Sequence, residues 1–283
     1  MKKTMKKILT AWLLGIPALL SAQHSLQSGL NMFRAGDELI KQQVGYKDPG
    51  LAGAGVLWDF SRLETVNEEY ALAYSTSDDS LITGTEHLTR YHYALQNDSL
   101  LLWGFNNQTT RLQHVQPELL LKFPVNYGDT VKTHYYAHGK YSNRLEMDVL
   151  GTIETGADAY GTMVLPGNDT LQQVLRTHTV KQMVEDIRPI NDSYYDKLKS
   201  PPVISPDSID QRLESDSVLF VVETFRWYEK GCRYPVFETV RSWEQRRTDS
   251  ESDSNSESES EFLSTAFFYP PQAQKPNKTI KNK

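Results

Sequence analysis

The stretch Arg144-Leu145-Glu146-Met147-Asp148-Val149 alternates polar and apolar side chains without a break. A period of two is typical of a β-strand with one buried face and one solvated face. Residues 218–227 are instead apolar on both faces, which is typical of a strand in the middle of a sheet. Together the two stretches predict a β protein with a well-packed core.

The same patterns run along most of the chain. From residue 36 to residue 243, roughly a dozen alternating or apolar runs are separated by turn-forming pairs such as Asn97-Asp98. Short strands at such intervals favour an antiparallel β-sandwich, so we predict an all-β fold with a β-sandwich domain over residues 24–247. A two-lobed version, divided near residues 117–128, stays open. We predict that the proline-rich residues 188–216 form a long loop.

The first 22 residues have the layout of a secretory signal peptide. Four lysines precede a thirteen-residue apolar run, and Leu20-Ser21-Ala22 then supplies small residues before Gln23. We therefore expect residues 1–22 to be removed and the mature protein to be exported, as a periplasmic, cell-surface or secreted protein. We expect no integral membrane segment in the mature chain, because no later stretch is apolar for long enough.

Two segments near the C-terminus differ from the rest. Residues 248–261 hold six acidic residues and six serines and no apolar side chain, so we predict a disordered linker. Residues 262–283 follow it as a short C-terminal tail, apolar at first and then rich in lysine.

Net charge limits the choice of partner. The formal charge is −6, and removal of the four lysines of residues 1–22 takes it to −10. Nucleic acid and anionic membrane surfaces attract clustered positive charge, so we expect neither as partner. The single cysteine, Cys232, excludes a disulfide framework and multi-cysteine metal sites.

The usual signatures of enzymes are absent from the sequence. It contains no G-x-S-x-G, H-E-x-x-H, P-loop or C-x-x-C motif, so we name no catalytic residue, no metal ligand and no cofactor. His134 and His138 are four residues apart, but on a strand that spacing spans about 13 Å, too far for one ion.

Aromatic residues are the best candidates for a ligand site. Tryptophan and tyrosine stack on sugar rings and anchor protein partners, although they also fill sheet cores. The candidates for ligand binding are Trp58, Trp103, Tyr91, Tyr93 and Tyr135.

The triplet Asp-(Ser/Thr)-aliphatic recurs six times. One explanation is structural, since Asp and Ser or Thr cap a turn and the aliphatic residue begins the next strand. The triplet also resembles the O-glycosylation motif of exported Bacteroidota proteins. Under that resemblance the candidate acceptors are Ser80, Ser99, Thr130, Thr170, Ser208 and Ser217.

Several longer segments resemble an uncharacterised family of exported β-rich proteins from Bacteroidota. They are Ala35-Gly36-Asp37, Gly55-Val56-Leu57-Trp58-Asp59-Phe60-Ser61, Lys122-Phe123-Pro124-Val125-Asn126-Tyr127-Gly128-Asp129, Tyr160-Gly161-Thr162-Met163-Val164-Leu165-Pro166, Trp227-Tyr228, Tyr234-Pro235-Val236-Phe237-Glu238 and Phe268-Tyr269-Pro270-Pro271. The resemblance implies no activity. Some members carry a C-terminal secretion sorting domain, which we do not expect here because a lysine-rich stretch follows instead.

Export, β-structure, aromatic richness and missing catalytic motifs together favour a non-enzymatic binding or interaction protein. Its ligand would be a glycan or another protein, for instance at a cell surface. The alternative is an extracytoplasmic hydrolase, for example one that acts on glycans. Only acidic residues and histidines without an assigned partner support this alternative. A cleft with two carboxylates would favour that alternative.

Overall fold

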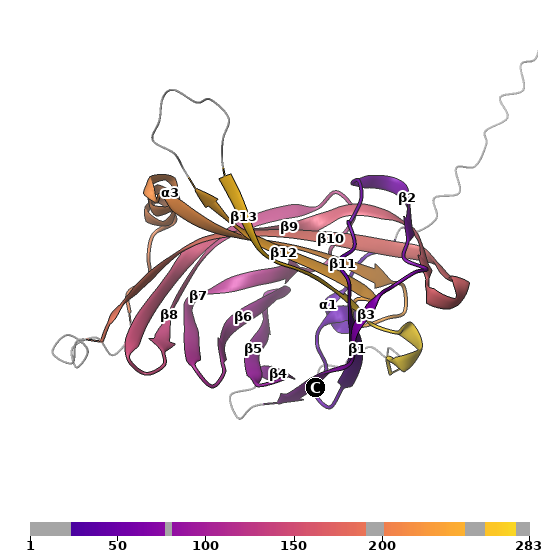
Figure 1. The fold of residues 1–283 in the computed structure, drawn as a ribbon, viewed down its shortest axis with the longest axis horizontal. Helices are drawn as coiled ribbons and strands as arrows, with labels where there is room; N and C mark the ends of the chain where they lie inside the picture. Colours follow the sequence, from indigo (N-terminus) through magenta and orange to yellow (C-terminus); the bar gives the residue numbers. More distant parts are fainter. Residues whose placement is uncertain (1–23, 77–80, 191–200, 247–257, 276–283) are drawn as a thin grey trace, which may run out of the picture.

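The computed structural model describes residues 24–76, 81–190, 201–246 and 258–275 (Figure 1). The expected signal peptide lies outside these residues. The strands of the described part are β1 (Glu38–Val44), β2 (Gly53–Asp59), β3 (Thr65–Thr76), β4 (Ile82–Glu86), β5 (Thr89–Gln96), β6 (Ser99–Asn106), β7 (Thr110–Lys122), β8 (Thr130–Tyr141), β9 (Leu145–Leu165), β10 (Asp169–Pro189), β11 (Val218–Glu229), β12 (Phe237–Arg246) and β13 (Ser258–Phe268). The helices are α1 (Ser28–Asn31), α3 (Pro206–Ser215) and the short 3₁₀ turns η1 (Pro166–Asn168) and η2 (Pro271–Ala273).

The strands form one closed barrel, so the predicted sandwich is wrong although the all-β prediction agrees with the structure. Twelve strands pair in the order β10-β11-β12-β13-β1-β3-β4-β5-β6-β7-β8-β9, and β9 then pairs with β10. All of these pairings are antiparallel, whereas β2 adds to β9 in parallel. Alternation along a strand indicates that the two faces of a sheet differ in polarity. It does not indicate whether the first and last strands pair to close a barrel, which is why a sandwich could not be distinguished from a barrel.

Two strands are much longer than the sequence suggested. β9 and β10 have 21 residues each and pair along almost their whole length, with the turn η1 between them. Glycines interrupt the apolar pattern of β9 and hide its continuity. Gly161 is required there by close packing, because a Cβ atom would lie 1.8 Å from the carbonyl oxygen of Val56 on β2.

The last strand belongs to the barrel rather than to a tail. β13 begins at Ser258, within the segment expected to be a disordered linker, and pairs with β12 on one side and β1 on the other. The predicted domain end at residue 247 therefore falls before the strand that closes the ring. The first part of the linker lies outside the described residues.

Part of the predicted loop over residues 188–216 is helical. Ser205 caps α3 by accepting a hydrogen bond from the backbone N–H of Ser208, and Pro206 occupies the first turn. Ile209 and Leu213, four residues apart, are buried against Tyr136 and other apolar residues of the outer barrel face. The helix therefore forms because its apolar stripe covers the sheet.

The N-terminal segment fills one end of the barrel lumen. Leu26 pairs with Val125, and Leu26 and Met32 pack among Leu121 and Tyr228. A second apolar cluster lies outside the barrel, where Trp58 of β2 packs edge-on against Trp227.

Candidate functional site

A pocket of about 120 Å³ lies in the lumen next to the N-terminal segment. Its wall comes from strands on opposite sides of the barrel, with Tyr93 on β5, Tyr228 on β11 and Glu238 on β12. Phe33 stacks on Tyr74 at 4.8 Å between ring centroids and also contacts Tyr234, so these three rings form one side of the pocket. We call this site the lumen pocket.

Two ion pairs face the lumen pocket. Lys41 Nζ lies 2.7 Å from Glu86 Oε1 and donates to the Tyr269 hydroxyl at 3.2 Å. The same ammonium group lies 3.9 Å from the ring centroid of Phe267, in favourable cation–π geometry. Arg226 Nε donates to Glu238 Oε2 in the second pair. Each cation is thus neutralised by a carboxylate.

Arg226 combines a position inside the barrel with an exposed surface. Burial alone would lower the pKa of the Arg226 guanidinium. The nearby Glu238 carboxylate and the neighbouring tyrosines have the opposite, larger effect, so the pKa is raised. Its side chain nevertheless keeps 33% of its accessible area. Arg226 is also one of the residues that line the lumen pocket.

Three tyrosines of the pocket carry hydroxyls with unused hydrogen-bonding capacity. Within the described residues, the hydroxyls of Tyr74, Tyr93 and Tyr228 have no hydrogen-bond partner. Burial raises the pKa of Tyr228 to about 12 and the pKa values of Tyr74 and Tyr93 well above the ordinary value. The hydroxyls stay protonated and can both donate and accept.

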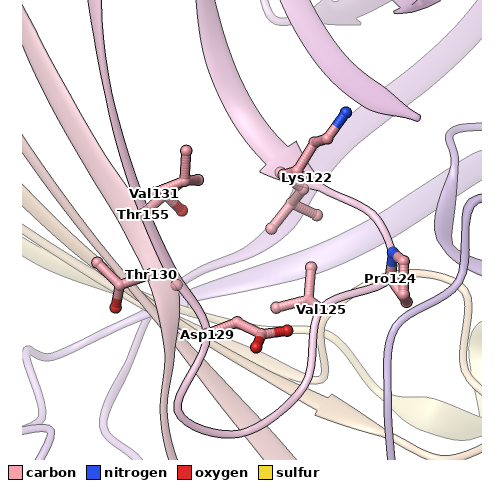
Figure 2. A pocket seen from close by; sticks show the side chains of 9 residues that line it. Lys122, Pro124, Val125, Asp129, Thr130, Val131 and Thr155 are labelled. Atoms are coloured by element: carbon pink, nitrogen blue, oxygen red, sulfur yellow. The ribbon is translucent and has the colours of Figure 1, made fainter. Parts of the chain in front are cut away.

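A second hollow opens in the barrel wall. The register between β7 and β8 ends at Gln116 and Tyr136, so residues 117–122 of β7 have no paired neighbour on β8. Figure 2 shows the resulting wall pocket of about 210 Å³, with Lys122 and Pro124 on one side and Thr130 and Thr155 on the other. Leu121, which is 6% exposed, lines both the wall pocket and the lumen pocket and so lies between them.

A third hollow of about 600 Å³ is an open groove over β5, β6 and β7. Trp103, Phe105 and the planar side chains of Asn106, Arg111 and Gln113 line it. A register shift at Trp103 lets β6 bulge there. We call this site the outer groove.

The structure separates the five aromatic candidates. Tyr93 lines the lumen pocket and Tyr91 stacks on it at 6.3 Å, whereas Trp103 lines the outer groove. Trp58 and Tyr135 are buried, at 3% and 0% exposure, in different apolar clusters. Sequence reasoning missed Lys41, Glu86, Arg226 and Glu238, and only a charge inside an otherwise apolar strand pattern could have pointed to them.

The histidines do not converge. His92 bonds to Asn106 at 2.9 Å, His134 to Asp210 at 2.9 Å and His138 to Asp148 at 2.7 Å. Across the ranges that the structure describes, no group of three His, Cys, Asp or Glu side chains is placed to hold a metal ion.

The candidate glycosylation positions lie at turns and strand starts, as the structural explanation requires. Thr130, Thr170, Ser208 and Ser217 are exposed and Ser99 is half-buried. Ser208 differs from the others because it lies in α3. Ser80 lies outside the described residues.

Fold and site define a closed antiparallel β-barrel with a small lumen pocket that is lined by aromatic and aliphatic side chains and by two ion pairs. Comparison of the chain with protein-family models, curated proteins and solved structures finds no match. No helix in the described ranges is long and apolar enough to cross a membrane.

Proposed function

We propose that the chain is an exported, non-enzymatic binding protein that holds a small, uncharged, hydroxylated ring in the lumen pocket. A single sugar unit has this chemistry. The observation that carries the proposal is a set of three hydroxyls on pocket-lining residues that have no hydrogen-bond partner in the part of the chain that the structure describes, namely those of Tyr74, Tyr93 and Tyr228. Buried polar groups are normally paired, so a ligand with hydroxyls would complete them.

The charge balance favours an uncharged ligand. Two cations and two carboxylates line the pocket, and they already pair with each other. An ionic ligand would have to break one of these pairs or remain uncompensated at low dielectric, which is costly. A neutral ligand can instead use the remaining N–H groups of Arg226 and the tyrosine hydroxyls.

The size of the pocket favours one ring. A cavity of roughly 150 Å³ holds benzene in a protein interior, so the lumen pocket, at about 120 Å³, leaves no room for more than one ring. A hexose has more heavy atoms than benzene, so the side chains that line the pocket must move outward to admit it. The stacked rings of Phe33, Tyr74 and Tyr234 supply the flat apolar wall that a sugar or cyclitol ring packs against.

Calorimetric titration with glucose, galactose, mannose and inositol, beside glucuronate and glucosamine, tests the proposal. We expect a neutral ring to bind and Tyr228→Phe or Tyr93→Phe to weaken binding about tenfold, the value of one lost hydrogen bond. Tyr127→Phe is the matched control, because Tyr127 is 36% exposed and lies outside the lumen pocket. Tighter binding of glucuronate or glucosamine than of any neutral ring would refute the proposal, as would binding that is unchanged in Tyr93→Phe and Tyr228→Phe.

Glycan hydrolysis is the second candidate function, and one observation favours it. Glu86 and Glu238 line the same pocket, and a pair of carboxylates is what glycoside hydrolysis uses. Each of these carboxylates is however already held in an ion pair, Glu86 with Lys41 and Glu238 with Arg226. The test is whether the protein releases the aryl alcohol from aryl glycosides. Release by the unmodified protein that is lost in both Glu86→Gln and Glu238→Gln would establish this function.

A further inference from the structure

A row of three unpaired cations crosses the outer face of the barrel next to the outer groove. Arg90 on β5 is in register with Asn106 on β6, Asn106 with Arg111 on β7, and Arg111 with Lys140 on β8. Neighbouring strands are about 4.8 Å apart, so the three charges lie within one short band. All three side chains are exposed, and within the described residues none of them forms an ion pair.

The row lies outside the lumen because side chains alternate along each strand. Tyr91 and Tyr93 face the lumen pocket side, so Arg90 and His92 point to the opposite face of β5. The band ends on β9 at Glu146, which is 1% exposed and is paired with Arg188. The ion pair of Glu146 is thus with Arg188 and not with Lys140, although the two residues are in register.

The outer groove adjoins this row and shares Arg111 with it. Trp103 supplies an aromatic ring, and the amide of Gln113 supplies groups that donate and accept. Asn106 adds the NH₂ of its amide, since its Oδ1 is bonded to His92. The hydroxyls of sugars match such amides, and sugar rings pack on tryptophan. The groove of about 600 Å³ is larger than one ring and open to solvent, which suits a chain of several units.

We propose that the outer groove and its cationic row bind an acidic oligosaccharide, such as a short chain of uronic acids. The mixture of one indole ring, two amides and a few spaced cations favours a glycan over nucleic acid. A duplex carries one charge per roughly 1.7 Å, and the formal charge of −6 on the whole chain repels such a dense polyanion. A short uronate chain needs only the local band of charge.

The test is calorimetric titration with trigalacturonate, maltotriose, hexa-glutamate and a single-stranded hexanucleotide at low salt. We expect trigalacturonate to bind, and Arg111→Gln combined with Lys140→Gln to weaken it at least tenfold. Binding should also weaken steeply with added salt, because the charges are exposed. Trp103→Phe should retain binding better than Trp103→Leu, since the phenyl ring preserves a stacking face.

Lys132→Gln is the matched control, because Lys132 is an exposed lysine on the same strand, β8, outside the cationic row. It should leave trigalacturonate binding within a factor of about two. The proposal fails if trigalacturonate does not bind, if Lys132→Gln weakens binding as much as the double variant does, or if hexa-glutamate or the hexanucleotide binds more tightly. Thermal unfolding of each variant verifies that it is folded.

Discussion

Lys41 Nζ and Glu86 Oε1 lie 2.7 Å apart inside the barrel and join β1 to β4 across the intervening strand β3. Lys41 is only 2% exposed, so its charge depends on this partner and on the surrounding rings. Removal of one partner leaves the other charge buried and uncompensated.

Lys41→Ala should therefore lower the free energy of unfolding by about 3–5 kcal/mol. Lys41→Met combined with Glu86→Gln should cost clearly less than the sum of the single substitutions, because no charge remains unpaired. Urea unfolding of the four proteins measures the coupling. Additive effects would show that the pair does not act as a unit.

Glu229 should make the protein less stable as pH rises. Its Oε2 atom is buried without a partner among the described residues, and burial raises the pKa of this carboxyl to about 7 from the ordinary 4.5. The folded state therefore holds the proton more tightly than the unfolded state, and stability falls between about pH 4.5 and 7. Glu229→Gln should raise the melting temperature at pH 8 and flatten this dependence, whereas Glu154→Gln, at an exposed position, should not.

A chain that ends at residue 247 should not fold cooperatively. It lacks β13, which joins β12 to β1, and would leave two long strand edges and the clusters around Ala266 and Phe267 open to water. A chain that ends at residue 275 should keep a sharp thermal transition. A cooperative transition in the shorter chain would mean that β13 is dispensable.

Ile209→Asp should detach α3 from the barrel. Ile209 is 0% exposed against the outer face, and a carboxylate there would be buried without a partner. We expect a loss of several kcal/mol of helix docking and faster proteolysis within residues 201–216, with ligand binding in the lumen pocket retained. Asp207→Asn, at an exposed position of the same helix, serves as control.

The glycosylation proposal has a direct readout. Native protein isolated from its source should have an intact mass above that of the bare chain, and peptides that contain Thr130, Thr170 or Ser217 should carry the excess, because these residues are exposed. Asp129→Ala, Asp169→Ala and Asp216→Ala should remove it stepwise. A mass equal to that of the bare chain would leave the turn explanation alone.

The sequence predicted the strands better than their arrangement. The alternation of residues 144–149 correctly predicted a strand, but its expected solvated face is wrong, because Glu146 and Asp148 are 1% and 9% exposed and pair with Arg188. Closure depends on pairings between distant segments, such as Gln42 with Phe268, and no local pattern encodes them. For α3, the capping serine and the spacing of Ile209 and Leu213 were visible, but four prolines nearby suggested a loop.

The candidate site was predictable only in part for the same reason. Tyr91 and Tyr93 could be recognised as a pair on one strand face, but Arg226 and Glu238, which line the lumen pocket with Tyr93, are more than 130 residues away in the chain. Net charge also misled: an acidic total of −6 hides the row formed by Arg90, Arg111 and Lys140, which only the strand register brings together.

The seam of the barrel joins opposite ends of the folded chain, since Val44 of β1 pairs with Ala266 of β13. During synthesis, more than 200 further residues must therefore be added after β1 before β13, the second strand that pairs with it, is available. Contacts of such long separation form slowly. The ring therefore cannot close before β13 has been synthesised, and until then β1 and β12 each keep one open strand edge.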